Sequence, residues 1–575
     1  MRTQRSRFVP PLQRSRLVSL IILCQLGVVA VPSHAGGLDR IWHDSDLGPI
    51  VRPAPIPHAT STAATVTFGR FTSVQVNVDL AGANILDDAA NEPSIAVDPT
   101  NPSRMAIGWR QFDTVESTFR EAGYGYTTDG GVTWRTGKVD PGVFHSDPVL
   151  ASDALGKFFY MGVTIENGEI VAQLFGSADQ GATWGPPVPA FGGDKEWMTI
   201  DRTQGPGRGH IYEYWSEDPP TFSRSIDGGL SFQSPTSIPS TPFYGTMDVG
   251  PDGTLYVVGS RLDLATFFVS RSTNAQIAAE TPTFTSVEVN LGGGQAFGVP
   301  NIDGLLGQPW IAVDPSRPGW IYVLCSVQTP DDPMDVMFVR STDGGQTWSS
   351  PVRVNDDPGN HAYQWFGTMS VAPNGRIDAV WNDTRGSGNK KKSALFYSYS
   401  NDGGVTWSPN EQASPTWTSS LGWHPVTKIG DYYHMVSSNS GADLAWAATF
   451  NREQDVYYTR IPAPVSMVTR GAATARALDL VSTDLRLIDN SPNPFASSTT
   501  IHFDMPGAGG HAKVEVFDAV GRRVTTLLDG FVMAGSQRVF WTGADDAGRP
   551  VNSGVYLCRL EAAGQSSTLK LMLMR

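Results

Sequence analysis

The octapeptide STDGGQTW occupies residues 341–348, and four closely similar octapeptides occur elsewhere in the chain. All five share the pattern S/T-x-D-x-G-x-T/S-W/F. The glycine at the fifth position can adopt positive φ, and the aspartate can accept backbone N–H groups across a turn. The last two residues, with their aromatic ring, suit the start of a strand. The pattern predicts a repeated hairpin turn, and it gives a structural role to Asp129, Asp179, Asp227, Asp343 and Asp402.

The octapeptides belong to a longer repeat. Each follows a pair of apolar runs joined by a turn rich in Gly, Pro, Asn or Asp, as hairpins require. Seven such pairs occur between residues 93 and 448, and they begin at Pro93, Pro148, Trp197, Gly245, Pro309, Gly367 and Tyr432. The octapeptide of the fourth repeat has degenerated to Ser272-Thr273-Asn274. Internal repeats of this kind indicate equivalent sheets arranged around one axis.

The seventh repeat ends after its third strand, at Pro462. The N-terminal segment Thr72–Asn77 matches Thr285–Asn290, the expected fourth strand of repeat four. We therefore expect Thr72–Asp79 to form the outer strand of the last sheet and to close the ring, which leaves only short, protected edges.

The octapeptide is identified as an Asp box, and its repetition resembles that of sialidase-like β-propellers. The resemblance implies an all-β propeller over residues 65–462. The seven repeats predict seven blades, which departs from the six blades of sialidases, and a six-bladed sialidase-like ring is the alternative. The turns between third and fourth strands would then lie at the end of the ring opposite to the entry of the first strands.

The N-terminus is typical of a secretory signal peptide over residues 1–35. Five arginines precede an apolar run from Leu17 to Val31, and Ser33-His34-Ala35 offers a small-residue cleavage site. Its removal would change the formal charge from −14 to −19, which argues against nucleic acid and anionic membranes as partners. No other apolar run is long enough to span a membrane. A loose arm is expected over residues 36–64 and a linker over residues 463–484.

Residues 485–575 alternate in polarity around the turns Asp518–Arg522 and Asp545–Arg549. This stretch resembles the FlgD-type immunoglobulin-like fold and the C-terminal sorting domains of type 9-secreted bacterial proteins. The resemblance implies a small β-sandwich, contact with an export machinery, and a secreted or cell-surface location in a Gram-negative-type bacterium. Only Cys325 and Cys558 remain outside the signal peptide, in different predicted domains, so a disulfide framework is not expected.

Acidic residues stand at the entry to several first strands. Carboxylates that face one cavity raise one another's pKa, which suits an acid catalyst. They could equally hold a cation such as calcium, or bond backbone N–H groups and water in the channel. No other cofactor is expected. The candidate catalytic residues are Glu92, Asp147, Glu196 and Asp431.

Basic residues follow the second strands. Sialidases clamp the substrate carboxylate with three arginines, so the resemblance implies substrate binding by Arg110, Arg385 and Arg452, from blades adjacent in a closed ring. Alternatively, each pairs with a nearby carboxylate such as Asp383. Trp365 is a candidate sugar-stacking platform, although aromatic residues in propeller strands more often belong to the core.

The sequence supports two functional hypotheses. The first is an exported propeller that acts on a glycan or glycoprotein, with exo-glycosidase activity of the exo-α-sialidase type. The second is a non-catalytic propeller that binds glycans or proteins at the cell surface.

Overall fold

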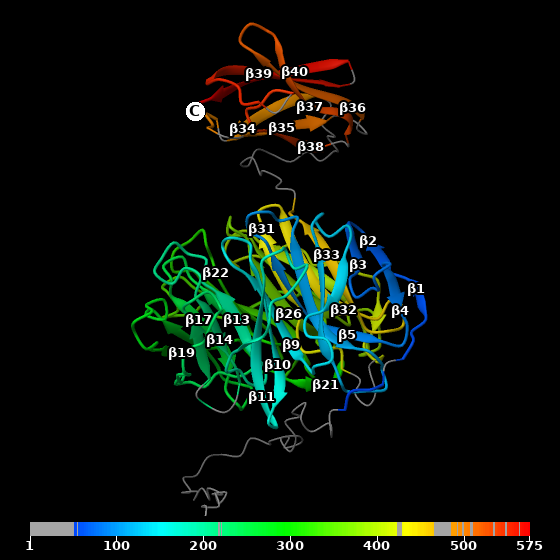
Figure 1. Ribbon diagram of the computed structural model, residues 1–575, viewed down its shortest axis with the longest axis vertical. Helices are drawn as coiled ribbons and strands as arrows, with labels where there is room; N and C mark the ends of the chain where they lie inside the picture. Colours follow the sequence, from blue (N-terminus) through cyan, green and yellow to red (C-terminus); the bar gives the residue numbers. More distant parts are fainter. Residues whose placement is uncertain are drawn as a thin grey trace, which may run out of the picture. The chain divides into compact units, whose positions relative to one another are not determined.

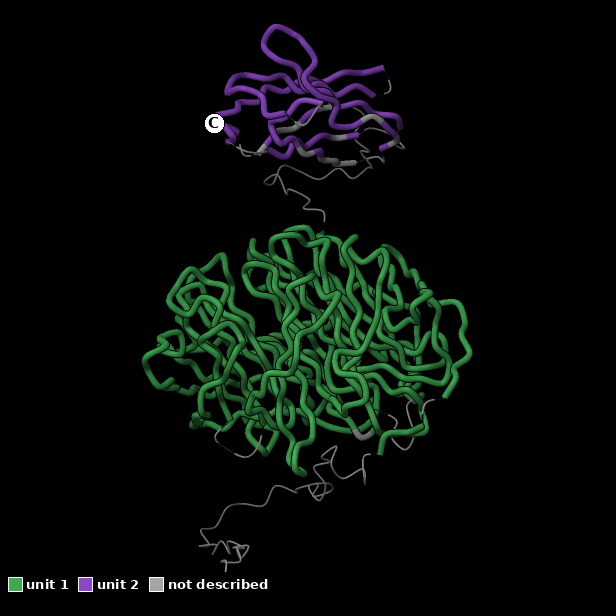
Figure 2. Tube along the Cα trace, viewed as in Figure 1, with its two compact units in different colours: residues 1–465 green, residues 466–575 purple. Residues whose placement is uncertain are grey.

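The computed structural model describes residues 51–54, 56–216, 219, 221–421, 428–464, 485–491, 493–496, 499–505, 510–532, 535–546, 549–562 and 564–574. These residues form strands, turns and irregular segments, and no helix. The chain divides into two compact units, Met1–Val465 and Ser466–Arg575 (Figure 2). The predicted signal peptide lies outside the described residues, as does nearly all of the predicted linker.

Seven antiparallel sheets of three to five strands follow one another along unit 1 (Figure 1). Blade 1 contains β5 (Ala89–Val97), β6 (Met105–Phe112), β7 (Glu121–Thr127) and β8 (Arg135–Lys138). Blade 2 contains β9 (Ser146–Ser152), β10 (Phe158–Glu166), β11 (Glu169–Ser177) and β12 (Val188–Pro189). Blade 3 contains β13 (Trp197–Ile200), β14 (Ile211–Tyr214) and β15 (Phe222–Ser225). Blade 4 contains β16 (Met247–Val249), β17 (Leu255–Ser260), β18 (Phe267–Ser272) and β19 (Thr285–Val289).

The remaining three sheets repeat this order. Blade 5 contains β22 (Trp310–Val313), β23 (Ile321–Val327), β24 (Asp335–Ser341) and β25 (Val352–Arg353). Blade 6 contains β26 (Gln364–Val371), β27 (Ile377–Asp383), β28 (Lys392–Ser400) and β29 (Glu411–Gln412), with β30 (Trp417–Thr418) also paired to β28. Blade 7 contains β31 (His434–Ser438), β32 (Gly441–Ala448), β33 (Asp455–Pro462), β3 (Phe71–Gln75) and β2 (Thr65–Phe68).

The blades form a closed ring. The first strands of all seven line one central cavity. Each first strand contacts that of the next blade, and β31 contacts β5. The expectation of an all-β propeller is confirmed, since sheets arranged radially around a channel define this fold.

The N-terminal strand β3 closes the ring by pairing with β33 in blade 7, where Val74 lies opposite Tyr458. The Val76 N–H continues the ladder with a 2.8 Å bond to the Val456 carbonyl. The expected closure through Thr72–Asp79 is therefore present, but β3 is not the outermost strand. A turn at Gly69 (φ 57°) folds β2 back onto β3, which covers the edge that β3 would otherwise expose.

The expected arm over residues 36–64 is not loose throughout. Within it, β1 (Thr60–Thr62) pairs with β4 (Ala83–Ile85), and β2 starts one residue beyond its end. Residues 36–50 lie outside the described residues.

The five Asp boxes share one geometry, except that in the second box Ala182 N–H donates to the Asp179 carbonyl instead of its side chain. In the box at residues 341–348, Asp343 Oδ1 accepts the N–H groups of Gln346 (3.0 Å) and Thr347 (2.9 Å), and Oδ2 accepts the Thr347 hydroxyl (2.6 Å). The Ser341 hydroxyl donates to Asp343 and accepts the N–H of Gly345. In blade 4, Asn274 accepts Thr283 N–H at 2.9 Å in the same way. Each box aspartate is thus engaged within its own turn.

The boxes also join neighbouring blades. Trp134 of the first box packs 5.4 Å from Tyr458 of blade 7, and Trp407 of the last box packs 5.2 Å from Phe338 of blade 5. The fifth-position glycines Gly131 and Gly404 have positive φ, and a Cβ there would approach these same rings to 2.2 and 2.0 Å. The glycine therefore serves both the turn and the close approach of two blades.

The boxes lie beside the turns between first and second strands. Gly130 N–H donates to Ser103 O, and Gly344 N–H donates to Gly319 O, at 3.0 Å each. This end of the ring is opposite to the entry of the first strands, and we call it the Asp-box end.

Unit 2 is a small β-sandwich with its own core. One sheet contains β34 (Arg486–Ser491), β35 (Thr499–Met505) and β38 (Gly535–Trp541). The other contains β37 (Arg523–Val532), β36 (Gly510–Asp518), β39 (Gly554–Ala562) and β40 (Gln565–Leu573). Apolar side chains of both sheets enclose one cluster, with Ile501 and Val514 fully buried in it.

Two further features concern the described residues. No helix among them could cross a membrane. Cys325 and Cys558 are both buried and form no disulfide.

Candidate functional site

Three of the four candidate acids lie in a buried network at the entry to the first strands. Acidic and basic side chains alternate around it, and we call it the charge ring: Glu92, Arg110, Asp147, Lys195, Asp431 and Lys428. Its members come from blades 1, 2, 3 and 7, which follow one another in the closed ring.

Each member of the charge ring lies within 4.0 Å of the next, so the contacts form a closed series. Arg110 Nε lies 3.0 Å from Glu92 Oε2, and Arg110 Nη1 lies 4.0 Å from Asp147 Oδ1. Lys195 Nζ lies 3.2 Å from Asp147 Oδ2 and 2.5 Å from Asp431 Oδ2. Lys428 Nζ completes the series, 2.8 Å from Asp431 Oδ2 and 3.9 Å from Glu92 Oε1.

The local backbone aims these side chains at the axis. Glu92, Asp147 and Lys195 hold φ values of 51°, 51° and 56°, unusual for residues with a Cβ. The register of the β5–β6 pair shifts between Asn91 and Ser94, around Glu92. Such an irregularity redirects a side chain at the end of a strand, which here brings residues of separate blades together.

A hairpin covers the charge ring. It consists of β20 (Phe297–Gly298) and β21 (Asn301–Leu305), between blades 4 and 5. The Asn301 amide donates to Gly430 O (2.7 Å) and accepts the Ile429 N–H (2.8 Å), while Leu305 N–H donates to Asp431 Oδ1 (2.9 Å). Glu92, Asp147 and Asp431 are consequently at most 2% exposed.

A layer of aromatic side chains separates the charge ring from the open channel. The rings of Trp197 and Trp310 lie 5.1 Å apart, and each lies 5.5 Å from His434. His434 Nδ1 lies 2.8 Å from Ser94 Oγ, and burial lowers the pKa of His434 to about 3, so this imidazole is neutral. All three residues line the cavity, whereas the members of the charge ring do not.

Burial and neighbouring charges divide the acids into two kinds. Both carboxyl oxygens of Glu196 are buried with no hydrogen-bond partner in the described part of the chain. Burial and the nearby Asp147 raise the pKa of Glu196 well above its ordinary value, so this side chain is a neutral acid. Burial opposes ionisation of Asp431 as well, but Lys195 and Lys428 hold its pKa below its ordinary value. Burial raises the pKa of Glu92, against the opposing effect of Arg110.

The candidate substrate-binding residues do not meet. Arg110 is fully buried in the charge ring. Arg385 pairs with Asp383 (2.8 Å) and Asp356 (2.6 Å) and lies over the Phe396 ring at 4.5 Å. Arg452 lies at an exposed turn with φ 74°. The alternative that the sequence left open, pairing with a nearby carboxylate, is found for Arg110 with Glu92 and for Arg385 with Asp383.

Trp365 belongs to the core. It is fully buried, its indole N–H donates to Ser393 Oγ at 3.0 Å, and its ring packs 4.6 Å from Phe366. A stacking platform must be reachable by a sugar, and this ring is not.

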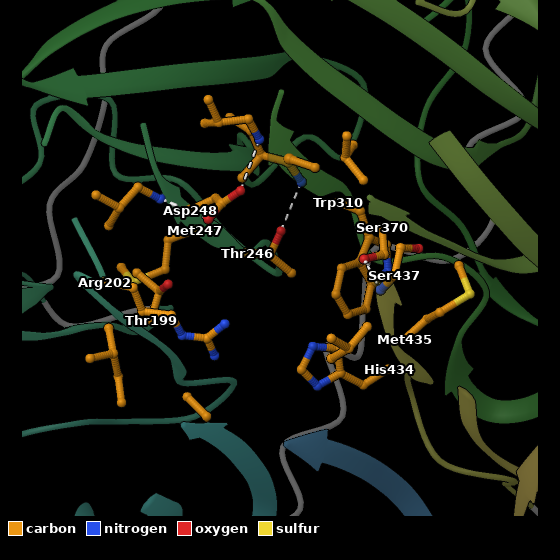
Figure 3. Close-up of a pocket in the computed structure, with 18 of the residues that line it drawn as sticks. Thr199, Arg202, Thr246, Met247, Asp248, Trp310, Ser370, His434, Met435 and Ser437 are labelled. Carbon is orange, nitrogen blue, oxygen red and sulfur yellow. Dashed lines mark hydrogen bonds between the residues drawn. The ribbon is translucent and has the colours of Figure 1, made fainter. Parts of the chain in front are cut away.

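A cavity of about 470 Å³ occupies the channel on the other side of the aromatic layer (Figure 3). It reaches Pro251, Pro315 and Pro373, exposed residues of the turns between first and second strands, so it opens at the Asp-box end. Its polar lining includes Thr199, Arg202, Asp248, Ser370 and Ser437. Arg202 points into its open centre (Figure 3).

Sequence reasoning named Arg110 but missed the other two basic members of the charge ring, Lys195 and Lys428. Lys195 precedes Glu196 and has the same strand-entry conformation as Glu92 and Asp147, so an alignment of the repeats at that position could have found it. Lys428 lies in a segment outside the repeat, and no signal in the sequence points to it. Arg202 and Asp248 were also missed, because all candidate residues were taken from the opposite end of the channel.

The described residues contain no group of three or more His, Cys, Asp and Glu placed to hold a metal ion. Within the charge ring, the ammonium groups of Lys195 and Lys428 lie between the carboxylates, where a cation would bind.

Residues 339–350 match a family model described as "BNR/Asp-box repeat". A comparison with curated protein sequences gives no match. Among solved structures, a protein of unknown function from Dyadobacter fermentans DSM 18053 is similar with TM-score 0.38 and 12% identity, over 70% of this chain and 99% of that chain. A Trypanosoma rangeli sialidase in complex with 2,3-difluorosialic acid gives TM-score 0.36 and 11% identity, over 88% and 89%. An α-L-arabinofuranosidase from Fusarium graminearum gives TM-score 0.31 and 13% identity, over 60% and 92%.

Proposed function

We propose that this chain is an exported propeller that binds glycans and does not hydrolyse them. The Asp boxes, and their resemblance to those of sialidase-like propellers, support a glycan as the ligand. The signal-like N-terminus and the sorting-domain-like C-terminal stretch support a secreted or cell-surface location.

The burial and ion pairing of the candidate acids are the main support for the proposal. Most glycosidases place two carboxyl groups on either side of the scissile bond, roughly 5–10 Å apart, and sialidases use a tyrosine as the nucleophile. Both kinds of site need room for the sugar beside a carboxyl group that it can reach. Here the spaces between Glu92, Asp147 and Asp431 are filled by Arg110, Lys195 and Lys428. Glu196 is a neutral acid, yet it is buried, so no glycosidic oxygen can reach it.

A panel of fluorogenic glycosides together with an array of immobilised glycans tests this function. We expect binding on the array without turnover of any glycoside. Turnover that is lost in Asp147→Asn and retained in Asp343→Asn would establish an exo-glycosidase and overturn the proposal. An absence of both turnover and glycan binding would overturn it as well.

A further inference from the structure

We propose that the cavity at the Asp-box end binds a small organic anion that carries one carboxylate and several hydroxyl groups, anchored by Arg202. A sugar acid has this chemistry. The inference rests on the proposed binding function and deepens it, because it names the site and the class of ligand.

Arg202 presents to the cavity a cation that no carboxylate of the described residues pairs with. Its Nε donates to Ser152 O at 2.7 Å, and its Nη2 donates to Ser152 Oγ at 3.0 Å, which fixes the guanidinium on blade 2. No carboxylate of the described residues lies within salt-bridge distance of it, whereas many other arginines of unit 1 have one, such as Arg376 with Asp378 at 2.8 Å. The fork that remains open points into the cavity (Figure 3).

A confined, unpaired guanidinium favours an anion. Arg202 is exposed to the cavity, and desolvation by the surrounding channel wall lowers its pKa, which the nearby Asp248 and Asp153 only partly offset. Asp153 is also engaged by Leu155 and Lys157 N–H groups in its own turn. A ligand carboxylate would supply the missing counter-charge and could accept two parallel N–H bonds from the guanidinium fork.

The rest of the cavity suits a hydroxylated molecule. The volume of about 470 Å³ lies within the range of roughly 300–1,000 Å³ that is usual for small-ligand sites. Thr199 of blade 3 and Ser370 of blade 6 contribute partly exposed hydroxyls on different sides of the channel. The Met247 and Met435 side chains provide apolar wall beside them.

Asp248 makes the binding depend on pH. Its oxygens accept N–H groups of Val249 and Val313 at 2.8 Å, and burial raises its pKa to about 6 despite these bonds and Arg202. The titratable side chains that line the cavity are Arg202, Asp248 and His434, and His434 is neutral. As the pH falls through about 6, Asp248 loses its negative charge and ceases to repel the bound carboxylate. Affinity for the anion should therefore rise on acidification.

Isothermal titration calorimetry with D-glucuronate and its uncharged counterpart D-glucose tests the site. Wild-type protein should bind glucuronate at least about tenfold more tightly than glucose, and Arg202→Gln should remove that preference. Arg208→Gln is the matched control, because Arg208 is an exposed arginine of the same loop that does not line the cavity. Equal affinity for both sugars, or an unchanged preference in Arg202→Gln, would overturn the inference.

Asp248→Asn provides a second test that does not depend on the folding of the arginine variant. The amide oxygen of asparagine can still accept the Val313 N–H. We expect glucuronate to bind this variant with the same affinity at about pH 5 and about pH 8, whereas wild type loses affinity over this range. A pH dependence that matches wild type would overturn the role of Asp248 and with it the charge argument.

The two proposals fail in different ways. Glycan binding on the array that survives in Arg202→Gln, with no glucuronate preference, would leave the proposed function intact and reject this site. Absence of glycan binding in wild type together with specific binding of glucuronate at Arg202 would retain the site and reject the broader function.

Discussion

At the scale of the residue, Glu196 and the box aspartates represent two opposite environments. Glu196 is buried without a hydrogen-bond partner among the described residues, so it is a neutral acid. The box aspartates are largely solvated, and their pKa values are lowered. In Asp129 desolvation opposes ionisation, but hydroxyl and backbone donors together lower the pKa to about 2. A carboxyl group is thus a buried core group in Glu196 and a solvated hydrogen-bond acceptor in the Asp boxes.

Glu196→Gln tests the buried acid. Because the folded-state pKa of Glu196 is raised, its contribution to stability is complete below the unfolded-state value near 4.5 and decreases as the pH rises. Glutamine cannot ionise, so the variant should lie within about 1 kcal/mol of wild type at about pH 5 and become the more stable protein at about pH 9. Urea unfolding at both pH values measures this, with the exposed Glu169→Gln as control. Parallel pH profiles for wild type and Glu196→Gln would contradict the assignment.

Asp343→Ala tests the Asp box as a structural element. The variant loses the acceptor for two N–H groups and two hydroxyls, which should lower the free energy of unfolding by about 1–3 kcal/mol. Asp331→Ala is the control, since Asp331 is exposed and no hydrogen bond or ion pair of its side chain is found in the described residues. Any glycan binding should be retained in both. Loss of binding without loss of stability in Asp343→Ala would indicate a ligand contact instead.

At the scale of the element, the charge ring joins the entry segments of four blades. Lys195→Met removes the base between Asp147 and Asp431 and leaves two buried acids without it, which should destabilise unit 1 by about 3–5 kcal/mol. Lys157→Met is the control, because the Lys157 side chain is partly exposed, lies over the ring face of Phe159 and has no carboxylate within salt-bridge distance among the described residues. Thermal unfolding measures the loss of stability in each of the two variants relative to wild type. Equal, small effects would mean that the closed series of contacts does not hold the blades together.

The strand β3 is the second element that closes the ring. It lies between β2 and β33, so Val74→Pro places a residue without an N–H group in the middle of a sheet. We expect a loss of at least about 3 kcal/mol, whereas Thr60→Pro, at the exposed start of β1, should be tolerated. Hydrogen exchange of the β33 amides gives an independent measure. Unchanged protection in Val74→Pro would show that blade 7 is complete without β3.

The elements that the sequence predicts are those that repeat. The paired apolar runs identify the first and second strands, and the octapeptide identifies the turns at Asp129 and Asp343, since each depends on local backbone chemistry. The match of Thr72–Asn77 to another fourth strand even predicts the ring closure. The hairpin β20–β21 and Lys428 lie in insertions that occur once in the chain. Asn301 of this hairpin is far in sequence from Ile429 and Gly430, beside the charge ring, and contacts them only in the folded protein. Burial of the candidate acids therefore could not be derived from the sequence.

At the scale of the whole unit, the two ends of the channel differ. One end is filled by the charge ring, its covering hairpin and the aromatic layer of Trp197, Trp310 and His434. The other opens between the turns that follow the first strands and carries Arg202, which has no carboxylate within salt-bridge distance among the described residues. The resemblance to sialidases predicts a site at the first end, whereas the packing leaves a cavity at the second end.

A crystal structure of the protein soaked with D-glucuronate tests this polarity most directly. We expect the sugar to lie in the cavity at the Asp-box end with its carboxylate on Arg202, and the contacts of Asp147 with Lys195 and of Asp431 with Lys428 to be unchanged. A sugar bound against Glu92, Asp147 or Asp431, with the β20–β21 hairpin displaced, would contradict it.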